Sequence, residues 1–136
     1  MSTRRITIKS DGGLEAILNE QGRRGGVVIC HPHPLFGGSM YNNVVEAVEE
    51  GFVLSGFSTL RFNFRGVGDS EGAYDEGNGE VNDVIAACKF MRDLPGAGGR
   101  LVLAGYSFGA WVASRAAVRR VPITVGSFRP TSTGYR

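Results

Sequence analysis

Cysteine is scarce in this 136-residue chain, and its scarcity excludes one class of small protein. Only Cys30 and Cys88 are present, each inside an apolar segment rather than in a Cys-x-x-Cys pair. Two scattered cysteines do not make the framework of cross-links that stabilises small secreted domains. We therefore expect both thiols to be reduced and the protein to be cytoplasmic.

Long hydrophobic runs are also missing. No apolar stretch approaches the roughly 20 residues that a membrane-spanning helix needs, and the opening residues Met1 to Ile6 lack the apolar core of a signal peptide. A hydrophobic fraction of 42% and a charged fraction of 21% are ordinary for a soluble globular protein of one domain. We expect no membrane partner.

Acidic residues are absent from the carboxyl-terminal third of the chain. All 13 lie at or before Asp93, whereas six arginines follow it. We therefore expect a single domain over residues 1–136 that ends in an atypical basic tail, residues 119–136. Basic segments can bind nucleic acid, but no Lys/Arg-rich run with interleaved aromatic residues occurs, so we expect no nucleic-acid partner.

Apolar residues repeat with the periods of strands and helices in alternation. Two runs of period two flank Ser10–Gly13 and predict an opening β-hairpin. Short apolar runs predict strands of a parallel sheet at residues 27–30, 58–64 and 101–104. Helical spacing predicts helices over residues 41–54, 80–94 and 108–118, with Asn78 capping the second. The fold class predicted is α/β, a mostly parallel sheet with helices on both faces.

The strongest motif is Gly105-Tyr106-Ser107-Phe108-Gly109, which lies between a predicted strand and a predicted helix. A serine at the tip of so sharp a turn needs a strained backbone, and side chains two residues away on either side would collide. Glycines fit both places. Ser107 is then the candidate nucleophile, and the N–H of Phe108 can stabilise an oxyanion. The alternative is an ordinary glycine-flanked loop.

A second motif, Cys30 to Ser39, follows the first predicted parallel strand. In a serine hydrolase this position supplies the second oxyanion amide; Pro34 cannot donate, so we rank the N–H of His33 first and that of Leu35 second. Alternatively, His31 and His33 bind a metal. Two ligands do not complete a zinc site and no further metal motif occurs, so we expect no metal and assign His31 to orienting the loop.

Glycines in the segment from Arg61 to Gly72 invite comparison with phosphate-binding loops. Their G-x-G-x-x-x-G spacing is one residue too long for the dinucleotide fingerprint, and no helix follows immediately. Four acidic residues between Asp69 and Glu76 would also repel a pyrophosphate. We expect a tight loop at the carboxyl edge of the sheet and no nucleotide or other cofactor.

Together these segments resemble the α/β-hydrolase superfamily, and look most like its small bacterial hydrolase-like proteins. The resemblance covers about residues 5 to 118 and rests on three segments in order, His31 to Asn43, Arg61 to Gly72, and Gly105 to Ala110. It implies that strand 27–30 lies between the other two parallel strands. It also implies a Ser–His–Asp triad, with Ser107 as nucleophile, that acts on small-molecule esters, thioesters or amides through an acyl-serine intermediate.

The chain departs from this family after the serine. Triad members in this fold follow the order Ser, then Asp or Glu, then His, yet none of these acids or bases occurs after Ser107. We therefore expect a truncated or frame-shifted protein that lacks the triad acid and base and is inactive by itself. The alternative is a non-catalytic fragment that self-associates, because half a sheet leaves an edge at which a homodimer can pair.

Overall fold

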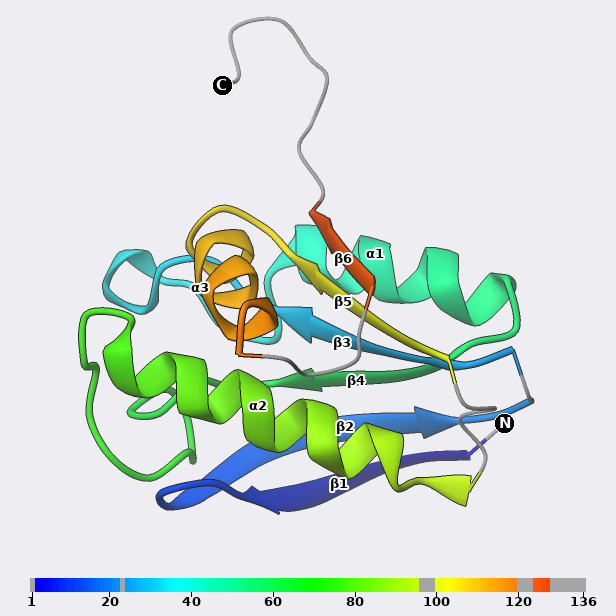
Figure 1. Cartoon of the computed structure of the whole chain (residues 1–136), viewed down its shortest axis with the longest axis horizontal. Helices are drawn as coiled ribbons and strands as arrows, with labels where there is room; N and C mark the ends of the chain where they lie inside the picture. The colour runs from blue at the N-terminus through cyan, green and yellow to red at the C-terminus, as the bar shows by residue number, and fades with distance from the viewer. Residues whose placement is uncertain (1, 23, 96–99, 120–123, 128–136) are drawn as a thin grey trace, which may run out of the picture.

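Strands and helices alternate along the chain after an opening hairpin (Figure 1). The computed structural model describes residues 2–22, 24–95, 100–119 and 124–127. The elements of these residues, in chain order, are β1 (Ser2–Lys9), β2 (Gly13–Glu20), β3 (Gly26–Cys30), a short 3-10 turn (Pro34–Phe36), α1 (Asn43–Leu54), β4 (Ser58–Phe62), α2 (Asn78–Arg92), β5 (Leu101–Gly105), α3 (Phe108–Ala117) and β6 (Thr124–Ser127). The predicted α/β class is confirmed.

The strands form one mixed sheet in the order β1-β2-β4-β3-β5-β6. β1 pairs with β2, and β2 with β4, in antiparallel register, whereas β3 runs parallel to both β4 and β5. The expected central place of β3 between the other two parallel strands is therefore confirmed. Because parallel strands end at the same edge, the loops that follow β3, β4 and β5 meet at one end of the sheet.

Helices cover both faces of the sheet, with α2 and α3 in front and α1 behind in Figure 1. Every residue of β3 is buried, which explains its continuous apolar sequence. Val28 and Cys30 pack in the core beneath α2 and α3, whereas Val27 and Ile29 pack with Val45 of α1. Burial of these side chains on both faces is the main favourable term that holds the layers together.

The cap predicted for the second helix is wrong by one residue. Asn78 is the first residue of α2, and Gly77, with a φ of 94°, is the cap. The buried carboxylate of Glu80 accepts hydrogen bonds from the N–H groups of Gly77 and Asp75, both at 2.9 Å. A side chain three residues into the helix thus binds the orphan backbone donors and lets α2 begin two residues before the predicted start.

Strand β4 is also shorter than predicted, ending at Phe62 rather than Phe64. The backbone beyond it leaves the ladder for other partners. Asn63 donates its N–H to the carbonyl of Glu15 at 2.9 Å, and Phe64 donates its N–H to the ring of His31 at 3.0 Å. Phe64 remains fully buried, so the alternating apolar pattern continues past the strand that it predicted.

A buried ion pair joins α2 to two loops. The carboxylate of Asp83, with a side chain only 1% exposed, accepts from Arg65 Nε at 3.1 Å and Nη2 at 2.8 Å, and from the hydroxyl of Ser10 at 2.9 Å. Arg65 also reaches Asp11 in the hairpin turn at 2.8 Å. These hydrogen bonds raise the pKa of Arg65 and lower that of Asp11. The pair fixes the loop after β4 against the helix.

Replacing Asp83 with Asn should lower the free energy of unfolding by about 2–3 kcal/mol, because a half-buried guanidinium loses its main counter-charge. Urea denaturation at pH 7 measures the change. Asp93→Asn is the control, since Asp93 is exposed and 3.8 Å from its partner Arg92, and it should change stability by less than about 0.5 kcal/mol. Equal losses in the two variants would contradict this account.

The carboxyl-terminal strand differs from the one expected. β6 spans Thr124–Ser127 and pairs in parallel with β5, from Val102 opposite Thr124 to Gly105 opposite Ser127. From sequence, Ile123-Thr124-Val125 is the segment expected to pair with β5, and Ile123 lies outside the described residues. β5 is therefore covered, and within the described part of the chain β6 is one of the two edge strands of the sheet, with β1 at the other edge.

An open edge of this kind presents backbone donors and acceptors to any second strand. We expect the isolated 136-residue polypeptide to dimerise through the β6 edge or to be poorly soluble. Sedimentation velocity over a range of concentrations measures its association. A monodisperse monomer at all concentrations would show that the edge is protected.

Candidate active site

Ser107 occupies the turn between β5 and α3 in a conformation that L-residues rarely adopt. Its φ is 58° and its ψ is −119°, and the side chain is exposed. Of the described residues other than glycine, only Glu76 shares a positive φ. Such a conformation persists only where the surroundings enforce it. The strained turn expected from the pentapeptide is therefore present.

Close backbone contacts at Gly105 and Gly109, where no side chain fits, enforce the turn. A Cβ placed on Gly109 would lie 2.1 Å from the carbonyl oxygen of Cys30 and 2.6 Å from that of His31. A Cβ on Gly105 would lie 2.6 Å from the carbonyl carbon of Gly109. The N–H of Tyr106 also donates to the Cys30 carbonyl at 3.2 Å. The turn thus packs directly on the end of β3, and both glycines are sterically required.

The loop after β3 lies beside this turn, as expected. The ring centroids of His33 and Phe108 are 4.7 Å apart, so His33 and Ser107 share one end of the sheet. The carbonyl of His33 accepts from the N–H groups of Phe36 and Gly38, and its Nδ1 accepts from the N–H of Leu35 at 3.1 Å. The second-choice oxyanion donor, Leu35, is thereby occupied.

Two backbone donors near Ser107 remain unpaired. Among the described residues, nothing accepts a hydrogen bond from the N–H of His33 or from that of Phe108. Phe108 is the first residue of α3, where no intrahelical acceptor exists. Unpaired donors that flank a serine can bind a developing negative charge on a carbonyl oxygen.

His31 is fully buried, and both of its ring nitrogens have partners. Nε2 accepts from the N–H of Phe64 at 3.0 Å, so Nδ1 carries the proton and donates to the carbonyl of Pro32 at 2.7 Å. Burial lowers the pKa of His31 to about 4 and keeps the ring neutral near pH 7. These bonds tie the loop after β3 to the end of β4 and leave no lone pair for a metal.

The other side chains that could bind a metal or act as nucleophiles are not arranged to do so among the described residues. Among the described residues, no group of three or more His, Cys, Asp or Glu side chains is placed to hold a metal ion. Cys30 and Cys88 are free and buried, and burial raises the pKa of both, that of Cys88 to about 12. Both thiols are therefore protonated and weakly nucleophilic. None of the described helices is long and apolar enough to span a membrane.

No carboxylate or imidazole among the described residues is hydrogen-bonded to the hydroxyl of Ser107. The buried carboxylates are committed to structure, with Glu80 bound to backbone amides at the start of α2 and Asp83 bound to Arg65. At this end of the sheet lie the exposed hydroxyl of Ser107, on a strained backbone, and the N–H groups of His33 and Phe108, which have no acceptor among the described residues.

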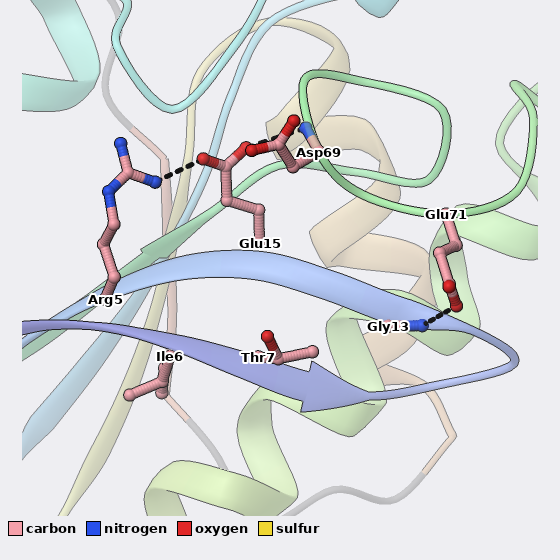
Figure 2. A pocket seen from close by; sticks show the side chains of 7 residues that line it. All are labelled: Arg5, Ile6, Thr7, Gly13, Glu15, Asp69 and Glu71. Atoms are coloured by element: carbon pink, nitrogen blue, oxygen red, sulfur yellow. Dashed lines mark hydrogen bonds and ion pairs between the residues drawn. The ribbon is translucent and has the colours of Figure 1, made fainter.

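A hollow of about 490 Å³ lies between the opening hairpin and the loop after β4 (Figure 2). Neither Ser107 nor His33 lines it. Among its charged side chains, Arg5 and Glu15 form an ion pair. Glu15 also accepts from the N–H of Asp69, and Glu71 accepts from the N–H of Gly13 at 2.8 Å. The acidic loop that begins at Asp69 is thus held against the opening hairpin by hydrogen bonds to Gly13 and Glu15.

Sequence reasoning missed Tyr74, whose hydroxyl lies 3.2 Å from Nε2 of His33. The two residues are 41 positions apart, and no motif contains Tyr74. It also missed the exposed rings of Phe36 and Trp111 at either side of the turn. Only the fold brings these side chains to the same end of the sheet.

Comparison with known proteins places the geometry in context. A family model described as the alpha/beta hydrolase family matches residues 27–135. The structure of an alpha-beta serine hydrolase homologue from Coxiella burnetii superimposes with a TM-score of 0.85 at 36% identity, covering 93% of this chain and 62% of that one. A Xanthomonas campestris protein, described as an a/b serine hydrolase without lid, gives 0.83 at 31% identity, covering 100% of this chain and 67% of its own.

A curated relative is similar over part of its length. An uncharacterised protein of Rickettsia prowazekii is 45% identical over 97 residues, which are 71% of this chain and 40% of that protein. The chain therefore spans about two fifths of this relative, and 62% and 67% of the two solved structures.

Burial of His31 makes stability depend on pH. Its pKa falls from 6.5 to about 4 on folding, so the unfolded chain binds the proton more tightly. The stabilising contribution is complete above pH 6.5 and is lost as the pH falls towards 4. The free energy of unfolding should drop by about 2 kcal/mol more between pH 7 and pH 5 in the wild type than in His31→Gln. Parallel urea titrations that show the same drop would contradict this.

Proposed function

Because this chain belongs to the alpha/beta hydrolase family, we propose that it carries the nucleophile and oxyanion-binding groups of a serine hydrolase acting on an ester, thioester or amide. The hydroxyl oxygen of Ser107 attacks the carbonyl carbon. The alcohol, thiol or amine then leaves with a proton, and water hydrolyses the acyl-serine. The observation that carries the proposal is the positive φ of Ser107 on a turn packed against the end of β3.

The oxyanion is assigned to the N–H groups of Phe108 and His33. Both lack partners among the described residues, whereas that of Leu35 is taken by the His33 ring. Loss of one such donor from a serine hydrolase costs about 3 kcal/mol of transition-state stabilisation. The hydrogen bonds that fix His33 therefore support catalysis through its main chain and not through its imidazole.

The proton from Ser107 must go to a base that the described residues do not supply, and no Asp, Glu or His follows Ser107 in the sequence. The chain alone is therefore proposed to turn esters over near background, with only the residual catalysis that oxyanion binding provides. The missing base and the open β6 edge equally favour a second candidate, a self-associating module without catalysis.

A fluorophosphonate probe tests the nucleophile. We expect one adduct, located at Ser107 by peptide mass spectrometry, when this chain is joined to the carboxyl-terminal part of a longer relative. Ser107→Ala should abolish the adduct. Ser114→Ala should not, because the Ser114 hydroxyl donates to the carbonyl of Ala110 on the same helix. Labelling that survives Ser107→Ala unchanged would remove the assignment, and efficient Ser107-dependent ester turnover by this chain alone would reveal a base within it.

A further inference from the structure

Five ring side chains from three separate segments form a continuous cluster beside the candidate nucleophile, which we call the aromatic row. Phe36 and His33 come from the loop after β3, Tyr74 precedes α2, and Phe108 and Trp111 lie on α3. Successive ring centroids are 4.8 Å apart for Phe36 and His33, 4.7 Å for His33 and Phe108, and 5.9 Å for Phe108 and Trp111. Tyr74 contacts the two central rings at 5.2 and 6.1 Å.

The row is buried at its centre and open at its ends. Phe108, which directly follows Ser107, is 8% exposed, whereas Phe36 is 85% and Trp111 50% exposed. Single exposed apolar residues are common on protein surfaces and need no explanation. Here two exposed rings are joined through the half-buried His33 and the buried Phe108, which directly follows the strained serine. A continuous exposed apolar surface of this kind is typical of a binding site.

The rings of His33, Tyr74 and Trp111 have contacts that hold them in place before any ligand arrives. His33 is bound at both ring nitrogens, by the N–H of Leu35 and by the hydroxyl of Tyr74. Trp111 carries the guanidinium of Arg115 at 4.9 Å from its ring centre. The other boundary of Trp111 is Gly77, where a Cβ would lie 2.3 Å from the indole. A surface that is already ordered loses little entropy when it binds a ligand.

We propose that the aromatic row binds a planar aromatic group of the substrate, so that the reaction at Ser107 favours aromatic esters, thioesters or amides over aliphatic ones of similar size. This inference rests on the proposed function, because it takes Ser107 as the reacting centre. Aromatic rings attract one another through offset and edge-to-face contacts beyond the area that they bury, and an alkyl chain gains only the area. Phe108 directly follows Ser107 in the chain, so the row begins at the residue next to the reacting serine.

Trp111 is the single tryptophan of the chain, so one indole N–H resonance reports on the row. The test titrates ¹⁵N-labelled Ser107→Ala chain with methyl phenylacetate and with methyl hexanoate, because binding to this variant needs no turnover. We expect both esters to shift the indole resonance and the dissociation constant of the aromatic ester to be about fivefold lower.

Matched variants separate ring contacts from apolar area. Phe36→Leu keeps an apolar side chain but removes the ring, and should cut the ratio of the two dissociation constants by at least about half. Leu54→Ala should change neither affinity, because Leu54 is 81% exposed on α1, behind the sheet.

Equal affinities for the two esters, or an aromatic preference untouched by Phe36→Leu, would overturn the proposal. Failure here is distinguishable from failure of the proposed function. If Ser107 is labelled by fluorophosphonate but the two esters bind equally, only the role of the aromatic row is overturned. If the aromatic ester binds more tightly but Ser107 is not labelled, only the assignment of Ser107 as nucleophile is overturned.

Discussion

The candidate site depends on one close backbone approach, that of Gly109 in α3 to the carbonyl oxygen of Cys30 at the end of β3. With 2.1 Å between that oxygen and any Cβ at position 109, only glycine lets the helix start where it does. The same carbonyl accepts the N–H of Tyr106, so the turn is fixed on both sides of Ser107. Main-chain packing at the edge of the sheet therefore enforces the positive φ of the serine.

Polar side chains then hold the neighbouring loops at that edge without taking part in chemistry. His31 joins the loop after β3 to Phe64, two residues past the end of β4, and Asp83 holds Arg65 against α2. Each of these groups is buried and fully bonded, which makes it costly to move and unavailable as a base or ligand. In the described part of the chain, the N–H groups of His33 and Phe108 near the serine have no hydrogen-bond acceptor.

The sequence by itself determined the layers of the fold and the place of the serine. Alternating apolar residues located the hairpin, a continuous apolar run located β3, and G-x-S-x-G between a strand and a helix located the turn. These patterns reflect local periodicity and local sterics. It misplaced the ends of β4 and α2, because Phe64 and Gly77 have partners, His31 and Glu80, that are side chains rather than continuing ladder or helix bonds.

Only the tertiary structure decided which of the two candidate N–H groups has an acceptor and which rings lie at the serine's end of the sheet. Sequence left His33 and Leu35 both open as donors, and the bond from Leu35 to the His33 ring removed the second. Tyr74 and Trp111 carry no motif, and they meet the loop after β3 because parallel strands bring distant loops to one edge of the sheet. Contacts of this kind depend on strand order, which no local pattern encodes.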